Sequence, residues 1–237
     1  MTNSEKVSMS YDKTYVIDPF QRVVLNGWPL DRYQALVYLI NMKGNRVLDI
    51  GCGNGSTLAA IGENFDELHG IEFSSVRAEN ATRNLRAYNT KIINVNIEER
   101  TPYPDEYFDC IFWADVIEHT INLWGAMEEI TRILKTGGTL ITITPNIAKI
   151  KARIRLLLGR FPATSASNEG FQIRAGEMFD GGHMHYFTYS MMRKLYHKYN
   201  LTVVREIGIG KYGRLHNFWR TLLSAEVVTV GKKASNA

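Results

Sequence analysis

Glycine residues alternate with other residues at positions 51, 53 and 55, directly after the apolar run at 47–50. Glycine adopts positive φ angles without steric cost and leaves room for a ligand against the backbone. A strand, a glycine turn and a helix in succession make the first unit of a doubly wound α/β sheet, in which ligands bind at the carboxyl ends of the strands. We therefore predict a ligand site here, with Asp49 at the strand end and Ser56 capping a helix that begins at Thr57.

The spacing of these glycines argues against a dinucleotide site. The fingerprint G-x-G-x-x-G, started at Gly51, requires glycine where the chain has Ser56. Started at Gly53, it requires glycine where the chain has Leu58. A nicotinamide-dependent oxidoreductase is therefore the weaker interpretation of this loop.

A carboxylate ends the next predicted strand. Residues 68–71 are predicted to form a short strand that ends at Glu72, 21 residues after Gly51. A carboxylate in this position can accept hydrogen bonds from both hydroxyls of a ribose. The alternative is a solvent-exposed glutamate at a strand end, but the glycine loop at this distance upstream favours the ribose role.

The pattern D-x-G-x-G-x-G at 49–55 resembles the first motif of the class I S-adenosylmethionine-dependent methyltransferases. Further stretches resemble later motifs of that family in the same order. They are P-x-x-D-x-x-F-D at 102–109, an E-H pair at 118–119, and R-I-L-K-T-G-G at 132–138, where the family usually has proline in place of Thr136. The resemblance covers about residues 45–146 and indicates the small-molecule group of these enzymes.

This resemblance implies a fold. The expected architecture is α/β, a doubly wound, Rossmann-like, seven-stranded mixed sheet with helices on both faces. Its last two strands, predicted at 201–207 and 222–230, would pair antiparallel at the sheet edge. The alternation of predicted strands and helices from residue 46 onward also favours a parallel sheet. We expect one methyltransferase domain over 1–237, with an N-terminal helical cap at 1–42 and an inserted helix and lid loop at 147–187.

The cofactor that the resemblance implies is S-adenosylmethionine. Asp49 would support the glycine loop and face the cofactor's ammonium, and Phe73 would cover one face of the adenine. Asn96 would accept from the adenine amino group, although the family usually has a charged Asp there. The expected cofactor-binding residues are Asp49, Gly51, Cys52, Gly53, Glu72, Phe73, Asn96, Ile97, Ala114 and Asp115.

Methyl transfer to a hydroxyl needs a base, because the sulfonium already activates the leaving group but the acceptor must lose its proton. Histidine suits this role since its pKa lies near neutral pH. The expected catalytic residues are His119, in the E-H pair, and His183, in a run G-H-x-H-x-F-T that also resembles the family. His183 and His185 alternate on an extended segment, so at most one of them should face the pocket.

Two alternatives for these histidines stay open. They can be structural residues that bond to the backbone. His183 and His185 can also ligate a metal together with Asp180, which is the weaker alternative. We predict no metal.

Composition is that of an ordinary globular protein. The chain has 237 residues, a mass of 27.0 kDa, a net charge of +4 and a pI near 9.0, which allows an anionic partner without requiring one. Cys52 and Cys110 do not form a disulfide framework and favour a reducing compartment. We expect neither a secretory signal nor a membrane-spanning helix, because the first residues are polar and no long apolar run occurs. The expected location is cytoplasmic.

A predicted amphipathic helix at 147–158 carries basic side chains, and no acid occurs from 147 to 160. Such a helix can make peripheral contact with an anionic membrane or steer phosphorylated substrates. The plainer interpretation is a lid or dimer helix with a solvated basic face, so a homodimer is a further alternative. The basic residues are Lys149, Lys151, Arg153, Arg155 and Arg160.

The predicted function is methyl transfer from S-adenosylmethionine to a small-molecule acceptor, with an oxygen of a sugar, glycan precursor or natural product favoured. The alternatives are a quinone- or lipid-type methyltransferase at the membrane surface and a non-catalytic S-adenosylmethionine-binding module. Nucleic acid is disfavoured, because residues 114–117 read Ala-Asp-Val-Ile, where enzymes that methylate nucleic-acid amino groups usually have an N-P-P-Y-like loop.

Overall fold

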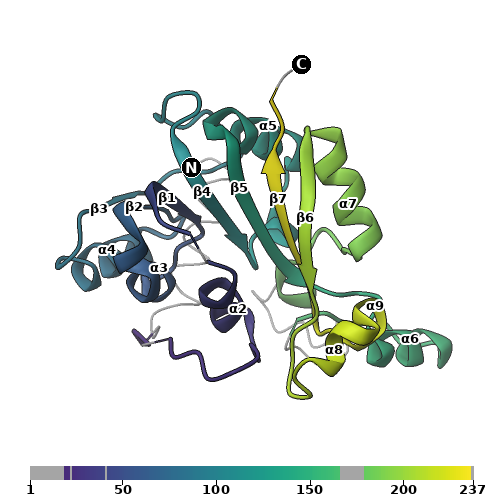
Figure 1. Ribbon diagram of the computed structural model, residues 1–237. Helices are drawn as coiled ribbons and strands as arrows, with labels where there is room; N and C mark the ends of the chain where they lie inside the picture. Colours follow the sequence, from purple (N-terminus) through teal and green to yellow (C-terminus); the bar gives the residue numbers. More distant parts are fainter. Residues whose placement is uncertain (1–18, 22, 41, 166–178, 236–237) are drawn as a thin grey trace.

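The computed structural model describes residues 19–21, 23–40, 42–165 and 179–235. Its centre is a seven-stranded sheet in the order β3-β2-β1-β4-β5-β7-β6 (Figure 1). Strands β1 to β5 run parallel to one another, while β7 runs antiparallel to both β5 and β6, so the mixed sheet is confirmed. The strands are β1 (Gly44–Ile50), β2 (Phe65–Ile71), β3 (Thr90–Ile93), β4 (Phe108–Ala114), β5 (Leu134–Pro145), β6 (Leu201–Ile207) and β7 (Glu226–Lys233).

Helices cover both faces of this sheet, as predicted. Val47 and Leu48 are neighbours in β1 but belong to different apolar clusters, because alternate residues of a strand point to opposite faces. Helices α5 and α7 complete the cluster around Leu48, and α2, α3 and α4 complete the one around Val47. The helices are α2 (Arg32–Leu39), α3 (Ser56–Ile61), α4 (Ser75–Asn84), α5 (Leu123–Ile133), α6 (Ile150–Leu157), α7 (Tyr189–Lys198), α8 (Leu215–Phe218) and α9 (Arg220–Leu223), with 3₁₀ turns η1 (Gly62–Asn64), η2 (Ile117–His119) and η3 (Phe179–Gly182).

The prediction that Ser56 caps α3 is wrong. The helix begins at Ser56 itself, and its N-cap is Gly55, which has a left-handed φ of 85°. The Ser56 hydroxyl instead donates to Oδ1 of Asn54 at 2.7 Å. Because glycine turns the chain sharply, the helix starts one residue earlier than a serine cap would allow.

The strand predicted at 222–230 begins later than expected. Residues Arg220–Leu223 are helical, and β7 starts at Glu226. The side-chain amide of Asn146 donates to the carbonyls of Thr221 and Ser224 at 3.2 Å and 3.0 Å. These bonds hold the turn in front of β7 against the end of β5, so the chain can pair only from Glu226 onward.

The predicted cap and insertion are described in part. The structure shows α2 within the segment 1–42, while residues 1–18 lie outside the described residues. In the segment 147–187 it shows α6, which is shorter than the helix predicted at 147–158, and the chain up to 165 and from 179. Residues 166–178 lie outside the description, and the domain boundaries stay predictions. No helix in the described ranges is both long and apolar enough to cross a bilayer.

Candidate active site

A cavity of about 330 Å³ lies at the carboxyl ends of β1, β2 and β4. Parallel strands bring the loops that follow them to one edge of the sheet, which is where such sheets bind ligands. The cavity gathers every cofactor-binding residue expected from the sequence, together with His119, whereas His183 is absent from the described residues that line it. Those expected residues are Asp49, Gly51, Cys52, Gly53, Glu72, Phe73, Asn96, Ile97, Ala114 and Asp115.

Gly51 and Gly53 hold the loop after β1 in a conformation that favours glycine, with φ angles of 73° and 57°. A Cβ on Gly51 would collide with the side chain of Val116, and a Cβ on Gly53 would collide with the guanidinium of Arg77. Val116 belongs to the turn after β4, so two neighbouring loops pack tightly here. Packing inside the protein therefore disfavours a larger residue at Gly51, whereas at Gly53 the flexible guanidinium can move and the positive φ is the main constraint.

Glu72 follows β2, and two backbone donors fix its carboxylate. The N–H of Gly53 donates to Oε2 at 2.8 Å, and the N–H of Ser74 donates to Oε1 at 2.9 Å. Arg77 Nη1 lies 3.8 Å from Oε2. Each carboxylate oxygen can accept more than one hydrogen bond, so this buried side chain can present both oxygens to a ligand in the cavity.

Arg32, the first residue of α2, forms an ion pair with Asp115 in the turn after β4. Both residues line the cavity. Burial raises the pKa of the Asp115 carboxyl, while the charge of Arg32 opposes this rise. Sequence reasoning missed Arg32, and the only signal was Asp31, which accepts from the N–H of Gln34 and so sets the start of α2.

His119 and His183 lie together, with ring centroids 4.7 Å apart. His119 lines the cavity from η2, and its Nδ1 lies 3.3 Å from the carbonyl oxygen of Gly182. Burial lowers the pKa of His119. Burial and the neighbouring His119 lower the pKa of His183 to about 4. Both rings are therefore neutral near pH 7.

His185 does not join this pair. Residues two apart on an extended segment share a side, so the expectation that His183 and His185 would face opposite ways is wrong. Gly182 and Met184 are among the described residues that line the cavity, and neither histidine is. His185 Nε2 lies 2.8 Å from the carbonyl oxygen of Thr120. The metal set of His183, His185 and Asp180 weighed from the sequence is therefore not assembled.

Residues 48–142, which include the glycine loop, Glu72 and the turn after β4, match a family model described as a methyltransferase domain. This part of the chain is a methyltransferase domain, in agreement with the family resemblance stated from the sequence. The match ends at residue 142, within β5, and so excludes α6 and everything after it.

Curated relatives of the methyltransferase domain match part of the chain. The chain is 33% identical over 103 residues to 27-O-demethylrifamycin SV methyltransferase of Amycolatopsis mediterranei, and this match covers 41% of this chain and 37% of that protein. The chain is 26% identical over 139 residues to demethylmenaquinone methyltransferase of Tropheryma whipplei, and this match covers 57% of this chain and 54% of that protein. The chain thus spans about half or less of the length of these relatives.

Structural similarity extends beyond the methyltransferase domain to nearly the whole chain. The crystal structure of geranyl diphosphate C-methyltransferase from Streptomyces coelicolor, in complex with Mg²⁺, geranyl diphosphate and S-adenosyl-L-homocysteine, has a TM-score of 0.64. The match covers 98% of this chain and 99% of that one at 13% identity. At such a low identity, the structural match shows the shared fold alone, and the Rossmann-like architecture is confirmed.

The methyltransferase domain fits the cationic end of S-adenosylmethionine. Asp49 is buried at the end of β1 and lines the cavity. Burial, with the charge of Glu72 as the second cause, raises the pKa of Asp49 to about 7. An ammonium group nearby would stabilise the ionised form and lower this pKa. The carboxylate is therefore suited to a ligand that carries a positive charge.

Asn96 and the neighbouring Asn94 lie where the sequence predicts that the adenine binds. Asn96 Oδ1 accepts from the N–H of Glu98 at 3.0 Å, and an amide oxygen has a second lone pair for an adenine amino group. Asn94, which sequence reasoning missed, donates through Nδ2 to the carbonyls of Glu72 and Phe73 at 2.7 Å and 3.0 Å. Asn94 thus fixes the backbone of the segment that holds Glu72 and Phe73.

Proposed function

We propose that the protein transfers the methyl group of S-adenosylmethionine to an oxygen of a small-molecule acceptor. The observation that carries this proposal is the bond from Gly53 to Glu72 inside a methyltransferase domain, because it presents a fixed carboxylate at the end of β2. The ribose hydroxyls would donate to Glu72, and the ammonium would meet Asp49. Phe73 and Ile97 line the same cavity and supply apolar surface for the adenine.

The acceptor oxygen attacks the methyl carbon in this reaction, the carbon–sulfur bond breaks, and its electron pair stays on sulfur. We assign the acceptor's proton to His119, because this histidine lines the cavity. Its Nδ1 faces a carbonyl oxygen that can only accept, so Nδ1 carries the ring proton and Nε2 has the lone pair. His183 contacts the His119 ring and acts as a positioning residue.

The acceptor class we favour is a sugar, a glycan precursor or a natural product. Tyr33, Ile121 and Met184 line the cavity in addition to the expected cofactor residues. Apolar and aromatic walls with a few polar groups are typical of sites for small organic ligands. The relative named as a rifamycin methyltransferase supports a natural-product acceptor.

The test is methyl transfer from S-adenosylmethionine that carries a deuterated methyl group. The purified chain is incubated with pools of sugars, nucleotide sugars and phenolic natural products, and mass spectrometry follows uptake of the label. Calorimetry on the same protein measures S-adenosylmethionine binding. We expect binding together with a labelled product. Failure to bind this cofactor, or preferential binding of a nicotinamide dinucleotide, would contradict the proposal.

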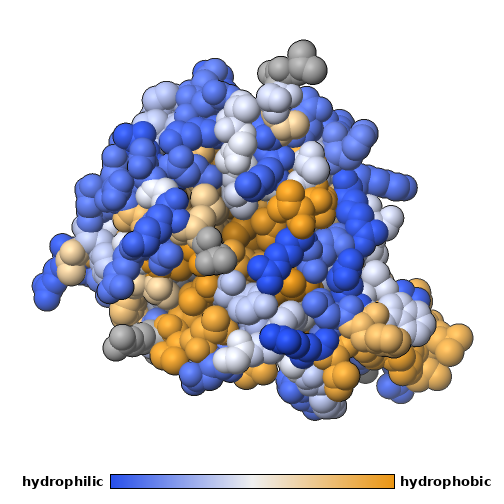
Figure 2. All heavy atoms as spheres, viewed as in Figure 1, coloured by the Kyte–Doolittle hydropathy of each residue, from blue (hydrophilic) through white to orange (hydrophobic). Residues whose placement is uncertain are grey.

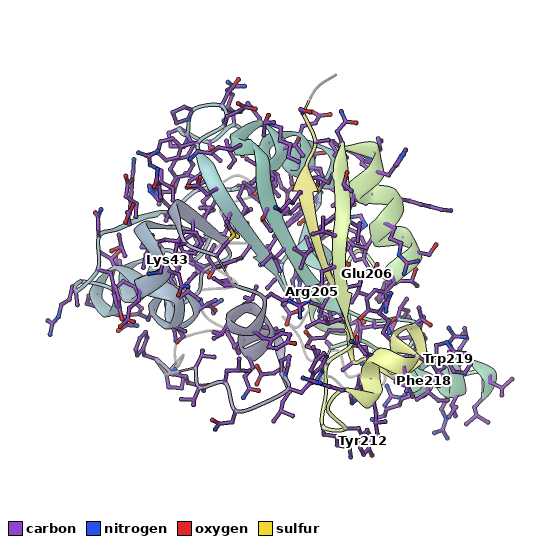
Figure 3. All side chains as sticks on the ribbon, viewed as in Figure 1. Lys43, Arg205, Glu206, Tyr212, Phe218 and Trp219 are labelled. Carbon is purple, nitrogen blue, oxygen red and sulfur yellow. The ribbon has the colours of Figure 1, made fainter. Side chains whose placement is uncertain are left out.

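A specific surface favours a second candidate, methyl transfer to a quinone- or lipid-type acceptor at a membrane. Helices α6, α8 and α9 lie at the same end of the molecule (Figure 1), where Figure 2 shows apolar side chains gathered. Figure 3 places Tyr212, Phe218 and Trp219 at this end. Leu157 and Phe218 are 85% and 90% exposed. We call this the α6–α9 surface, formed by Ile150, Ile154, Leu156, Leu157, Leu158, Tyr212, Leu215, Phe218 and Trp219.

Basic residues are frequent in the segments that form the α6–α9 surface, and one of them, Arg220, is paired with Glu206 at 3.1 Å. No Asp or Glu occurs in 147–160 or in 207–225. Apolar side chains flanked by basic ones fit the interface of an anionic bilayer, where the rings and aliphatic chains enter the lipid and the cations meet the headgroups. The relative named demethylmenaquinone methyltransferase supports this candidate. The basic residues are Lys149, Lys151, Arg153, Arg155, Arg160, Lys211, Arg214 and Arg220.

A further inference from the structure

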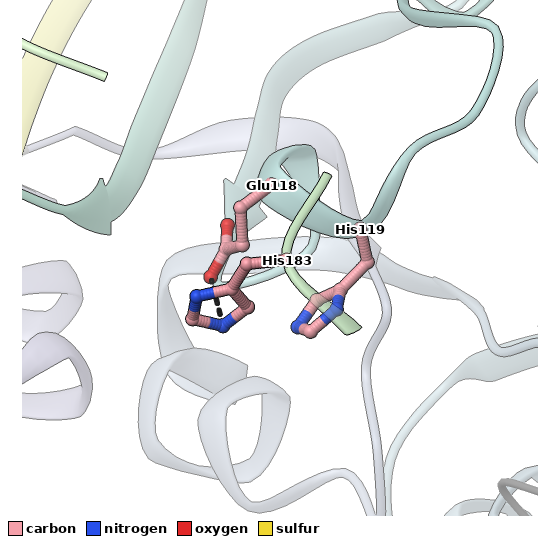
Figure 4. A group of neighbouring side chains, drawn as sticks. All are labelled: Glu118, His119 and His183. Atoms are coloured by element: carbon pink, nitrogen blue, oxygen red, sulfur yellow. Dashed lines mark ion pairs between the residues drawn. The ribbon is translucent and has the colours of Figure 1, made fainter. Parts of the chain in front are cut away.

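Glu118, His119 and His183 bring three groups that can ligate a metal together beside the cavity (Figure 4). Glu118 and His119 belong to η2, whereas His183 directly follows η3, so two segments far apart in the chain meet here. Their ligand atoms all lie within 4.8 Å of one another. We propose that this cluster binds a divalent transition-metal ion of the zinc class, which departs from the sequence-based prediction of no metal.

The ligand set has the chemistry that zinc prefers. Two imidazole nitrogens and one carboxylate oxygen form the protein part of many catalytic zinc sites, which keep a fourth position open. Hard cations such as Ca²⁺ and Mg²⁺ prefer sites made of oxygen. Glu118 is buried and His183 has a side chain only 8% exposed, so the ion would be held away from bulk water on this side.

The outer partners of His183 orient its ring for a metal. Thr164 Oγ1 donates to Oδ2 of Asp180 at 2.9 Å, and His183 Nδ1 lies 2.7 Å from the same hydroxyl oxygen. The hydroxyl proton is used on Asp180, so Nδ1 of His183 must be the donor in this pair. Its Nε2, 3.9 Å from Oε1 of Glu118, then has the lone pair. A chain from carboxylate to ligating histidine is the usual second layer of a metal site.

The other two ligands have outer partners too. His119 Nδ1 faces the carbonyl of Gly182, which places the lone pair of that ring on Nε2. Glu118 Oε2 accepts from the hydroxyl of Thr144 at 3.0 Å. This bond fixes the carboxylate and leaves its other oxygen, Oε1, facing His183. All three ligands thus have their orientation set by a second partner.

The backbone holds the two segments in register. The N–H groups of Met184 and His185 donate to the carbonyl of Glu118 at 2.7 Å and 3.1 Å. In a tetrahedral zinc site with bonds of about 2.0–2.1 Å, ligand atoms are about 3.3 Å apart. The Glu118 and His183 atoms are 3.9 Å apart, so small side-chain rotations would complete the site.

Charge favours a cation here as well. Asp115 and Glu226 add two further acids near Glu118, and Arg32 is the cation that faces them. Neutral imidazoles do not compensate these acids, so the surroundings of the cluster suit a divalent cation.

Binding of the ion does not depend on the proposed methyl transfer. If that transfer occurs, the ion changes the part played by His119, because its Nε2 becomes a ligand. An acceptor hydroxyl could then take the open fourth position, since His119 also lines the cavity. The ion would lower the pKa of that hydroxyl, whose proton would pass to water.

The experiment measures metal binding to the full chain. Protein stripped of metal with a chelator is titrated with Zn²⁺ in a competition assay with a chromogenic chelator, and with Co²⁺ as a spectroscopic probe. We expect one Zn²⁺ per chain at micromolar or lower Kd. We also expect a visible Co²⁺ absorption spectrum typical of four-coordination with nitrogen and oxygen ligands. A chain that binds neither ion overturns the proposal.

Variants decide whether this cluster is the site. Loss of an outer partner of a metal ligand usually costs about 10–100-fold in metal affinity. Loss of a ligand itself should cost more, so His183→Ala and Glu118→Gln should each weaken Zn²⁺ binding by at least about 100-fold. His185→Ala is the matched control, because that ring bonds to the backbone of Thr120 and should leave Zn²⁺ affinity unchanged. Thermal unfolding of metal-free samples shows whether each variant folds, and His119→Ala provides a second ligand variant in case Glu118→Gln does not.

Zn²⁺ affinity equal to wild type in folded His183→Ala and His119→Ala would overturn the proposal. Loss of affinity in His185→Ala together with retention in His183→Ala would place the ion elsewhere and overturn it too. Measurement of S-adenosylmethionine binding in the chelated protein separates this inference from the proposed function. Cofactor binding that survives without Zn²⁺ affinity would overturn the metal site alone.

Discussion

The backbone N–H of Gly53 donates to Oε2 of Glu72 at 2.8 Å and joins the two segments on which the proposed cofactor site depends. Ser74 holds the other oxygen at 2.9 Å. An ionised carboxylate can accept about four hydrogen bonds, so about two acceptor positions remain for the hydroxyls of a ribose. Loop and acid are therefore arranged before a ligand enters, which reduces the entropic cost of binding.

Replacing Glu72 should weaken cofactor binding. We expect Glu72→Ala to raise the Kd for S-adenosylmethionine at least about ten-fold, because two hydrogen bonds to a charged group are lost. Calorimetry measures the Kd. Glu63→Ala is the control, since Glu63 is an exposed acid in η1, the turn directly before β2. A wild-type Kd in Glu72→Ala would remove this residue from the cofactor site.

Gly51 and Gly137 together separate the cost of backbone strain from the cost of a steric clash with a neighbouring side chain. Its φ is 73°, and an added Cβ would collide with Val116. Gly137 has a φ of 76°, but nothing lies within 4 Å of an added Cβ there. Both alanine variants should lose about 1 kcal/mol or more from the positive φ, and Gly51→Ala should lose about 1–3 kcal/mol in addition from overpacking. Urea unfolding measures the difference, and equal losses would contradict the tight packing between the loops after β1 and β4.

His119 should carry the proton transfer once an acceptor is known. We expect His119→Ala to lower kcat by about 10²–10⁴-fold, the usual worth of general base catalysis, while the Kd for S-adenosylmethionine stays unchanged. His197→Ala, at an exposed position of α7, is the control. Normal kcat in His119→Ala would exclude the base role. Loss of wild-type turnover on chelation would assign His119 to the metal instead.

Short-range chemistry made the cofactor side predictable from the sequence. The positive φ at Gly51 and Gly53 and the acid after β2 depend on a few adjacent residues, and strand ends in a parallel sheet meet at one edge. Arg32 could not be predicted in the same way, because its ion pair with Asp115 joins positions 83 residues apart. Nothing in the local sequence indicates which side of α2 will face that turn.

The wrong predictions have local causes that depend on tertiary contacts. Ser56 has the right chemistry for an N-cap, but the left-handed Gly55 takes that position. The run at 222–230 has the apolar pattern of a strand from its first residue, but side-chain bonds from Asn146 keep its start helical. Glu118 was missed as a partner of His183, because their contact exists only after η2 and the segment after η3 are brought together.

Glu226 should make stability depend on pH. Its Oε2 is buried without a hydrogen-bond partner in the described part of the chain. Burial, with Asp115 as the second cause, raises the pKa of its carboxyl from 4.5 to about 8. The folded protein therefore retains this proton at pH values where the unfolded chain has lost it. The resulting contribution to stability is complete below about pH 4.5 and falls as pH rises to about 8.

Glu226→Gln removes this titration while keeping the shape of the side chain. The variant should match wild type near pH 5 and be more stable by on the order of 1 kcal/mol at pH 9, which corresponds to a few degrees in Tm for a chain of this size. Thermal unfolding from pH 5 to 9 measures the difference in Tm. A difference that does not grow with pH would show that the carboxyl of Glu226 is not protonated in the folded protein.

The α6–α9 surface should bind anionic bilayers. Burial of a large apolar side chain contributes about 1.5–3 kcal/mol, so Leu157→Ser combined with Phe218→Ser should weaken binding to phosphatidylglycerol vesicles by at least about ten-fold. Val204→Ser is the control, because Val204 is 53% exposed on β6. Vesicle sedimentation measures the bound fraction. Binding should fall with added salt and be weak on phosphatidylcholine, since the basic residues contribute through anionic headgroups. Equal sedimentation with both lipids, or a double variant that binds like wild type, would exclude the membrane candidate and leave the acceptor to be sought among water-soluble molecules.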